Sequence, residues 1–407
     1  MGRHPSLASL EHDVIYSSYC LALQGEASAV DWAAFAPVDW ETWKKRVQAE
    51  GVAPLLYHTL TRAGWPEGVP ADVQAWLQAA FYTNTSRNLL LYKELARVLA
   101  ALETAEIPAL VLKGPVLAAT VYEHIGLRPI TDLDLLVPEA QLAAAIETTV
   151  RGLRYSPYGG PQWTAGVLQL LSPEANFFGG EHLPLRVELH WTLLGAEAGR
   201  YRPPAVWFWE HTETVALPEA RVTLLQPAAH ILYLAAHYVF RHRGAQERLI
   251  WLCDLRQLIE CQSERWDWDE LARNAQALGW SAAVQVALQD TQDRLGKVVP
   301  GGLLERLARD ADPQAARLIA RRADPHQTRT MRLWDRLSGI PWWPRLRLLA
   351  AALVPNPEFM HYRYRLRPAW LWPLGYAIRW LDVLREAMVT LRRVGMDRIG
   401  NIAFHNP

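Results

Sequence analysis

Two aspartates, Asp132 and Asp134, stand two residues apart in the run TDLDLLV. The apolar residues that follow predict a buried strand, and alternate residues of a strand leave the same face of a sheet. Two carboxylates that converge on one face repel each other and resist joint ionisation. A divalent cation removes that repulsion, and Mg²⁺ is commonly held by one or two carboxylates together with substrate phosphates. The pair indicates nucleotide chemistry, although an aspartate at the mouth of a strand is also a common turn residue.

Two further motifs could complete such a site. The run VLKGP ends a strand at the start of a helix, where free backbone N–H groups attract an anion such as a triphosphate, and Lys113 beside Gly114 adds a positive charge. In RVELHW, Glu188 could present a third carboxylate, with His190 on the same face. Three acids beside a phosphate-binding turn favour a two-metal displacement, in which one metal activates the attacking oxygen and the other holds the triphosphate.

Other polar residues have less certain roles. Arg128 lies four residues before Asp132 and would neutralise the acids, contact phosphate or be an exposed loop arginine. His237 and Arg241 share one face of a predicted helix, which is either solvated or directed at the nucleotide. Asp254 falls on the apolar side of the next helix, and a buried carboxylate needs a partner. We hypothesise that it pairs with His237 or Arg241 and braces the helical domain over the nucleotide; direct substrate contact is the alternative.

Several classes of site are disfavoured. His237 and His242, together with Cys253 and Cys261, do not have the usual spacing of zinc ligands. The sequence contains neither a Gly-x-Ser-x-Gly elbow nor a Walker-type Gly-Lys-Ser/Thr turn, which argues against a hydrolase triad and a P-loop enzyme.

The elements that position these residues form four predicted regions. Residues 1–105 have helical periodicity, and 226–310 return to helices. Between them, 106–225 alternate strands and helices, which predicts a small mixed sheet. Apolar runs bounded by turn residues predict strands at 110–112, 133–137, 166–172 and 183–194. A helix is expected to start at Pro138 and to run towards Gly152. Residues 311–407 form a basic, tryptophan-rich extension.

The composition indicates a folded protein. The chain has 407 residues, of which 50% are hydrophobic, and its 42 basic and 42 acidic residues give a formal net charge of zero. Three cysteines are too few for a disulfide framework, so we expect a reducing cytoplasm. No run resembles a leader peptide or reaches the ~20 apolar residues that span a bilayer, so we expect a chain that is neither secreted nor membrane-spanning.

The neutral total hides a basic C-terminal extension. Residues 329–398 hold 13 arginines, no lysine and five acids, and Trp342 and Trp343 are among the tryptophans between them. This mixture suits an anionic membrane surface, RNA or another polyanion. It also suits an extension packed on the protein's own acidic part, with its tryptophans buried.

Together these motifs resemble the uncharacterised bacterial nucleotidyltransferases of the DNA polymerase β-like superfamily. The likeness rests on LKGPVLAATVY, LRPITDLDLLV, VELHW, AAHYVFRH, LIWLCDLRQLI and DWDEL. It implies an α+β fold, in which a minimal mixed sheet is flanked by helical N-terminal and C-terminal regions. It also implies a phosphate turn at Lys113 and Gly114, metal binding by Asp132 and Asp134, and Glu188 as third acid. Pro115 stands where the superfamily has a serine.

The expected activity is transfer of a nucleoside monophosphate from an NTP to an acceptor hydroxyl or phosphate, with Mg²⁺ or Mn²⁺ as cofactor. In this prediction Asp132, Asp134 and Glu188 are catalytic and hold the metals, while the nucleotide contacts Lys113, Gly114, Arg128, His237 and Arg241. The acceptor is a small molecule, a protein or RNA. The competing prediction is a catalytically silent scaffold that docks a biosynthetic partner or a membrane surface through its C-terminal extension. The expected location is cytoplasmic, with peripheral membrane attachment as an alternative.

Overall fold

The computed structural model describes residues 14–159, 167–243, 247–262, 266–324, 329–364, 373–385 and 388–389. Packing divides the chain into two compact units. The first contains residues up to 158 together with 174–193 and 203–323, and the second contains 159–173, 194–202 and the chain from 324 onward. The predicted division into four regions remains a prediction.

The first unit begins with helices that carry an aromatic core. Trp32 stacks on Trp40, with ring centroids 5.8 Å apart, and Trp43 is buried beside them. Gly51 ends the second helix in the left-handed conformation (φ 75°), which favours glycine. The elements are α1 (Val14–Gln24), η2 (Ala27–Ala29), η3 (Trp32–Ala34), α2 (Pro37–Glu50), α3 (Ala53–Ala63) and α4 (Ala71–Thr104).

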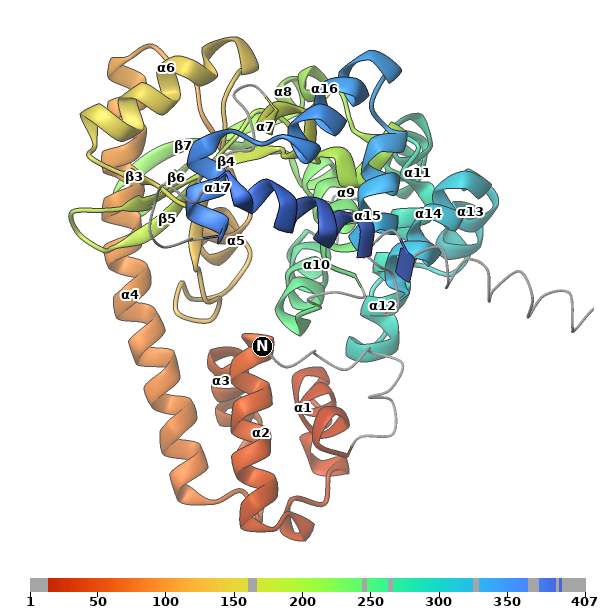
Figure 1. The fold of residues 1–407 in the computed structure, drawn as a ribbon. Helices are drawn as coiled ribbons and strands as arrows, with labels where there is room; N and C mark the ends of the chain where they lie inside the picture. Colours follow the sequence, from red (N-terminus) through yellow and green to blue (C-terminus); the bar gives the residue numbers. More distant parts are fainter. Residues whose placement is uncertain are drawn as a thin grey trace, which may run out of the picture. The chain divides into compact units, whose positions relative to one another are not determined.

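Helix α4 links these helices to the sheet (Figure 1). Its 34 residues extend for about 50 Å at 1.5 Å per residue. It packs on α3 and reaches strand β7 (Ala220–Leu225). Leu91, Leu95 and Val98, at three- and four-residue spacing along it, are buried, so α4 connects two parts of one core.

A mixed seven-stranded sheet forms the centre of the first unit, in the order β3-β4-β5-β2-β1-β7-β6. The β2–β5 and β1–β7 pairs are parallel, and the other neighbouring pairs are antiparallel. The α+β prediction is therefore confirmed. The strands are β1 (Leu110–Leu112), β2 (Asp132–Leu136), β3 (Ser156–Pro157), β4 (Glu174–Gly179), β5 (Leu185–His190), β6 (Thr212–Leu217) and β7.

Helices connect and follow the strands. Asp267 caps one of them, accepting a hydrogen bond of 2.8 Å from the backbone N–H of Glu270, as its residue type predicts. The connecting elements are α5 (Gly114–Thr120), η4 (Glu139–Gln141), α6 (Leu142–Glu147), η5 (Thr148–Gly152) and α8 (Ala205–Glu210). The following elements are α9 (Pro227–His237), η7 (Tyr238–His242), α10 (Leu249–Cys261), α11 (Trp268–Ala277), α12 (Ser281–Leu295), α13 (Leu303–Arg309) and α14 (Pro313–Ala323).

The second unit has a small core of its own. Leu337, Ile340, Leu348 and Ala351 pack against Val167 and Ala196. Its elements are α7 (Leu168–Leu171), η6 (Ala196–Tyr201), α15 (Arg329–Ser338), α16 (Trp342–Leu353) and α17 (Pro357–Tyr364). No helix in the described ranges is long and apolar enough to cross a bilayer.

Two strand predictions need correction, and one hairpin was missed. The strand expected at 166–172 is wrong: 168–171 form α7, and the strand begins at Glu174. A short apolar run fits a helical turn as well as a strand, which explains the error. The strand expected over 183–194 is shorter, since β5 ends at His190. The β6–β7 hairpin was not predicted, although Glu219, at φ 71°, lies in its turn.

Candidate active site

Strands β2 and β5 bring the acidic residues together. Their parallel register places Asp134 opposite Glu188 and Leu136 opposite His190. Ligand atoms of Asp134, Glu188 and His190 all lie within 4.8 Å of one another, and all three residues are buried. Strand pairing thus explains why Asp134 and His190 converge although they lie 56 positions apart in the sequence.

Asp134 is the most enclosed acid of this group. Its Oδ1 accepts a hydrogen bond of 2.9 Å from Lys113 Nζ and lies 3.0 Å from His190 Nε2. Burial raises the pKa of Asp134, but the charge of Lys113 and the hydrogen bond from His190 outweigh it and hold this pKa well below its usual value. Asp134 is therefore an anion compensated by two neighbouring cations.

Glu188 has a different electrostatic environment. Arg186 Nε lies 3.0 Å from its Oε1, and His190 Nε2 lies 3.5 Å from its Oε2. Burial, together with the negative charge of Asp134, raises the pKa of Glu188 despite the hydrogen bond from His190. Neighbouring carboxylates with pKa values moved in opposite directions are suited to different roles: Asp134 to holding a cation, and Glu188 to accepting a proton.

Behind the group, Arg241 anchors a further acid. Its guanidinium makes two contacts with Glu174 on β4, one of them 2.6 Å long. Burial raises the pKa of Glu174, but Arg241 and the charge of His190 lower it to about 2. Glu174 Oε2 lies 3.7 Å from His190 Nδ1. Burial lowers the pKa of His190, yet hydrogen bonds to Asp134 and Glu188 and the charge of Glu174 raise it to about 9.

Asp132 lies outside the buried group of three. Its carboxylate contacts the Arg186 guanidinium and accepts a hydrogen bond of 3.1 Å from Thr131 Oγ1. Its side chain is 21% exposed, against 4% for Asp134. The two aspartates share a face as predicted, but Asp132 occupies its accessible edge.

The predicted phosphate turn has a strained backbone. Lys113 has φ 49° and ψ −117°, a conformation that L residues rarely adopt. A Cβ on Gly114 would lie 2.9 Å from Arg128 Nη1 and 3.0 Å from Ile130 Cγ2, so only glycine fits there. From this turn the Lys113 ammonium reaches Asp134.

Arg128 and Asp254 form a buried ion pair. Arg128 Nη2 lies 2.8 Å from Asp254 Oδ2, Nε lies 3.2 Å from Oδ1, and the Tyr122 hydroxyl donates to Oδ1 over 2.8 Å. The hypothesis that Asp254 pairs with His237 or Arg241 is therefore wrong, because helical periodicity identified a buried face but not the loop that packs on it. The alternative of an exposed Arg128 is also wrong, since this residue is 8% exposed.

The predicted polar face of α9 is buried. His230 and His237 are 3% and 6% exposed, so the solvated alternative is wrong. Burial lowers the pKa of His230 to about 4 and that of His237 well below its usual value. The His237 ring packs 4.6 Å from His242 and 5.6 Å from Tyr233, measured between centroids.

Two residues of the site were missed from the sequence, and both had a signal. Arg186 lies two residues before Glu188 on the same strand, so the spacing that relates Glu188 to His190 also places Arg186 on this face. Glu174 pairs with His190 across β4 and β5. The misplaced strand at 166–172 concealed it.

The donor set fits a divalent cation. The carboxylates of Asp134 and Glu188 lie within one ligand-to-ligand span and suit Mg²⁺ or Mn²⁺. His190, whose raised pKa keeps it protonated at neutral pH, would become a third ligand only after losing its proton. Cys253 and Cys261 are free thiols and do not belong to this group.

The chain has similarity to one protein family and to one solved structure. Residues 36–296 match the sequence profile of a family described as uncharacterised nucleotidyltransferase. No curated protein matches the chain significantly. A crystal structure of an antigenic nucleotidyltransferase-like protein from Paracoccidioides brasiliensis is 12% identical, with a TM-score of 0.32, over 57% of this chain and 97% of that one.

Proposed function

This chain belongs to the uncharacterised nucleotidyltransferase family, and from that premise we propose that it transfers a nucleoside monophosphate from an NTP to an acceptor with Mg²⁺ or Mn²⁺. The observation that carries the proposal is the convergence of Asp134, Glu188 and His190 on one sheet face, with Asp132 at its accessible edge. Acids gathered in one buried cluster, with pKa values that their neighbours move in opposite directions, are typical of a functional site.

In the proposed reaction, the acceptor oxygen attacks the α-phosphorus of the NTP. A bond forms between that oxygen and phosphorus, the bond from phosphorus to the bridging oxygen breaks, and pyrophosphate leaves. Glu188 accepts the acceptor's proton, a role that its raised pKa supports. Asp132, Asp134 and Glu188 would hold the divalent cation, which neutralises the phosphates and stabilises the leaving group.

Lys113 must move for this reaction to proceed. Its ammonium lies 2.9 Å from Asp134 Oδ1, on an oxygen that a metal ion would coordinate. If Asp134 held a divalent cation, Lys113 would lose this contact, and its ammonium would be free to contact a phosphate. The other proposed nucleotide contacts are Gly114, Arg128, His237 and Arg241. In the structure Arg128 and Arg241 form ion pairs with carboxylates.

The same contact favours a second candidate function. Lys113 already supplies a positive charge to Asp134, and Pro115, which lacks both hydroxyl and N–H, starts the helix after the turn. A protein whose metal position is permanently filled by Lys113 would be a catalytically silent scaffold. The two candidates differ in whether Mn²⁺ can displace Lys113.

The deciding experiment incubates the full chain with α-labelled NTPs, Mg²⁺ or Mn²⁺, and pools of small-molecule, protein and RNA acceptors. We expect Asp132→Asn and Glu188→Gln each to reduce label transfer on the order of 10³-fold, since each removes several kcal/mol of charge stabilisation or proton transfer. Asp293→Asn alters an exposed acid of α12 and serves as the matched control. Transfer that survives both site substitutions refutes the assigned residues, and absence of NTP binding favours the scaffold.

The C-terminal extension is proposed to provide a peripheral contact surface for a cytoplasmic enzyme. On α16, Trp342, Trp343 and Leu346 are 68%, 63% and 51% exposed, while Leu348 is buried in the core of its own unit. Exposed tryptophans beside arginines suit an anionic membrane surface. Flotation with vesicles of phosphatidylserine and phosphatidylcholine should recover the protein at low salt, and Trp342→Ala with Trp343→Ala should abolish recovery. Wild-type protein that stays unbound eliminates membrane attachment and leaves a biosynthetic partner or RNA as the occupant.

A further inference from the structure

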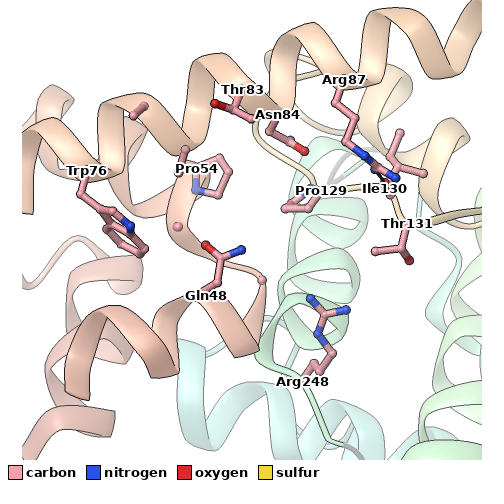
Figure 2. Close-up of a pocket in the computed structure, with 14 residues that line it drawn as sticks. Gln48, Pro54, Trp76, Thr83, Asn84, Arg87, Pro129, Ile130, Thr131 and Arg248 are labelled. Atoms are coloured by element: carbon pink, nitrogen blue, oxygen red, sulfur yellow. Dashed lines mark hydrogen bonds between the residues drawn. The ribbon is translucent and has the colours of Figure 1, made fainter. Parts of the chain in front are cut away.

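A cavity of about 460 Å³ lies in the first unit beside the acidic site, within the size range of small-ligand pockets. Its wall combines α2, α3, α4, the loop before β2 and the residue that precedes α10 (Figure 2).

The cavity is positively charged. Two arginines, Arg87 and Arg248, line it, and no aspartate or glutamate does. Arg87 donates to the Ile130 carbonyl, and Arg248 Nε donates to the Ala49 carbonyl over 3.0 Å. Within the described part of the chain, neither guanidinium forms an ion pair with a carboxylate. Each therefore keeps N–H groups and a charge that an anion could use.

The fold makes room for one of these guanidiniums. A Cβ on Gly51 would lie 2.6 Å from Arg248 Nη2, so the absent side chain lets the arginine lie against the backbone. In Figure 2 the Arg248 side chain extends from its element toward the space between Gln48 and Pro129. Burial and the charge of Arg128 lower the pKa of Arg248, and the charges of Glu50, Asp132 and Asp254 only partly offset this. A bound anion would stabilise the charged form further.

The other cations near the site are already compensated. Lys113 binds Asp134, Arg128 binds Asp254 and Arg241 binds Glu174. These are the residues that the sequence assigns to phosphate. Since each carries a carboxylate partner, an incoming phosphate would have to displace that carboxylate. Arg87 and Arg248 require no such exchange.

Residues that line the cavity also contact residues of the acidic site. Thr131 lines the cavity, and its Oγ1 donates to Asp132 Oδ1 over 3.1 Å. Ile130, also in the wall, lies where a Cβ on Gly114 would meet it. A molecule in the cavity thus lies next to the accessible aspartate and the turn.

We propose that Arg87 and Arg248 bind a phosphate group of a substrate in this cavity. Two sources share this chemistry: the polyphosphate of the NTP and the phosphate of a phosphorylated acceptor. The choice between these sources rests on the proposed function, whereas phosphate binding itself does not. Trp76 and Pro54 supply an apolar wall for the rest of the bound molecule.

The test measures binding to the full chain by calorimetry in EDTA, so that neither metal nor turnover is needed. The probes are inorganic tripolyphosphate, ATP and glycerol 3-phosphate. We expect Arg87→Gln and Arg248→Gln each to weaken binding roughly 10- to 100-fold, the usual effect of losing a hydrogen bond between charged groups. Arg248→Lys keeps the charge and should lose less. Arg151→Gln, at a side chain 81% exposed on η5, is the control and should bind as wild type.

Outcomes separate the sources and the proposals. ATP and tripolyphosphate that compete for one site assign the cavity to the NTP, and glycerol 3-phosphate that binds together with ATP assigns it to the acceptor. Binding that is unchanged in both glutamine variants, or absent from wild type, overturns the inference. If circular dichroism shows that an arginine variant does not fold, tryptophan fluorescence provides a second test. A fluorescence change on ligand binding that occurs in wild type and is lost in Trp76→Phe supports the site. Arginine-dependent binding without any nucleotidyl transfer would overturn the proposed function and leave this inference intact.

Discussion

The acidic group on the sheet and the arginine-lined cavity differ in whether their charged side chains form ion pairs. In the acidic group every carboxylate has a cation beside it, as Lys113 is beside Asp134 at 2.9 Å and Arg241 is beside Glu174. In the cavity wall, Arg87 and Arg248 donate to backbone carbonyls, and neither forms an ion pair with a carboxylate of the residues that the structure describes. Charges compensated from within contribute to the fold, whereas charges left uncompensated are available to a ligand. The following predictions use this contrast.

The largest expected effect comes from Lys113→Met. Removing one partner of a buried ion pair costs about 3 to 5 kcal/mol of unfolding free energy, and we expect about 4 kcal/mol here because Asp134 keeps only His190. If Lys113 occupies the metal position, saturating Mn²⁺ should restore about 2 to 3 kcal/mol in the variant and less in wild type. Urea unfolding with and without Mn²⁺ measures both values.

Lys93→Met is the matched control, because Lys93 is exposed on α4 and its loss should change stability by less than about 0.5 kcal/mol. Equal stabilisation of wild type and Lys113→Met by Mn²⁺ would show that the lysine does not hold the cation position.

Arg128→Gln should have the next largest effect, about 3 kcal/mol. The loss is smaller than at Lys113 because the Tyr122 hydroxyl still donates to Asp254 over 2.8 Å. A double-mutant cycle with Asp254→Asn, followed by urea unfolding, should give a coupling energy of about 2 to 3 kcal/mol. Additive effects of the two substitutions would contradict a direct pair.

His230 should make stability depend on pH. Burial, with the charge of Arg128, lowers its pKa from 6.5 to about 4 in the folded chain. Between those values the unfolded chain binds more protons, so this contribution is complete above pH 6.5 and is lost as the pH falls toward 4. The loss amounts to about 3 kcal/mol over that window.

Urea unfolding of wild type and His230→Gln between pH 7.5 and 4.5 isolates the contribution of His230 to the free energy of unfolding. The difference in stability between the two proteins should shrink as the pH falls. A difference that stays constant with pH would place the titration elsewhere.

The smallest effect is expected in the cavity wall. Arg87→Gln and Arg248→Gln each remove a hydrogen bond to a carbonyl, so unfolding free energy should fall by no more than about 1 kcal/mol. The same denaturation assay compares them with Arg128→Gln. A loss in either variant as large as that of Arg128→Gln would abolish the contrast between the two regions.

The sequence predicts which acidic residues share a face of the sheet, but it does not predict which residues form ion pairs with them. Period-two spacing places Asp132 and Asp134 on one face, and the same rule relates Glu188 to His190. The partner of Asp254 could not be derived in this way, because Arg128 lies in a loop without periodicity. The cavity is also hidden from the sequence, since Arg87 and Arg248 belong to separate helical patterns that only tertiary packing brings to one wall.

Arg248 docks on Ala49, and the backbone N–H of Leu249 donates to Glu50 over 2.6 Å, each across a sequence separation of 199 residues. During synthesis the N-terminal helices emerge from the ribosome long before the segment that closes the cavity. Asp134 and Glu188 are both translated before Arg248, so the acidic group can assemble while the cavity is still open. Such long-range closure is slow relative to local folding. Ligand binding in the cavity would therefore report that this long-range closure has taken place, and pulse-labelled nascent chains could time it.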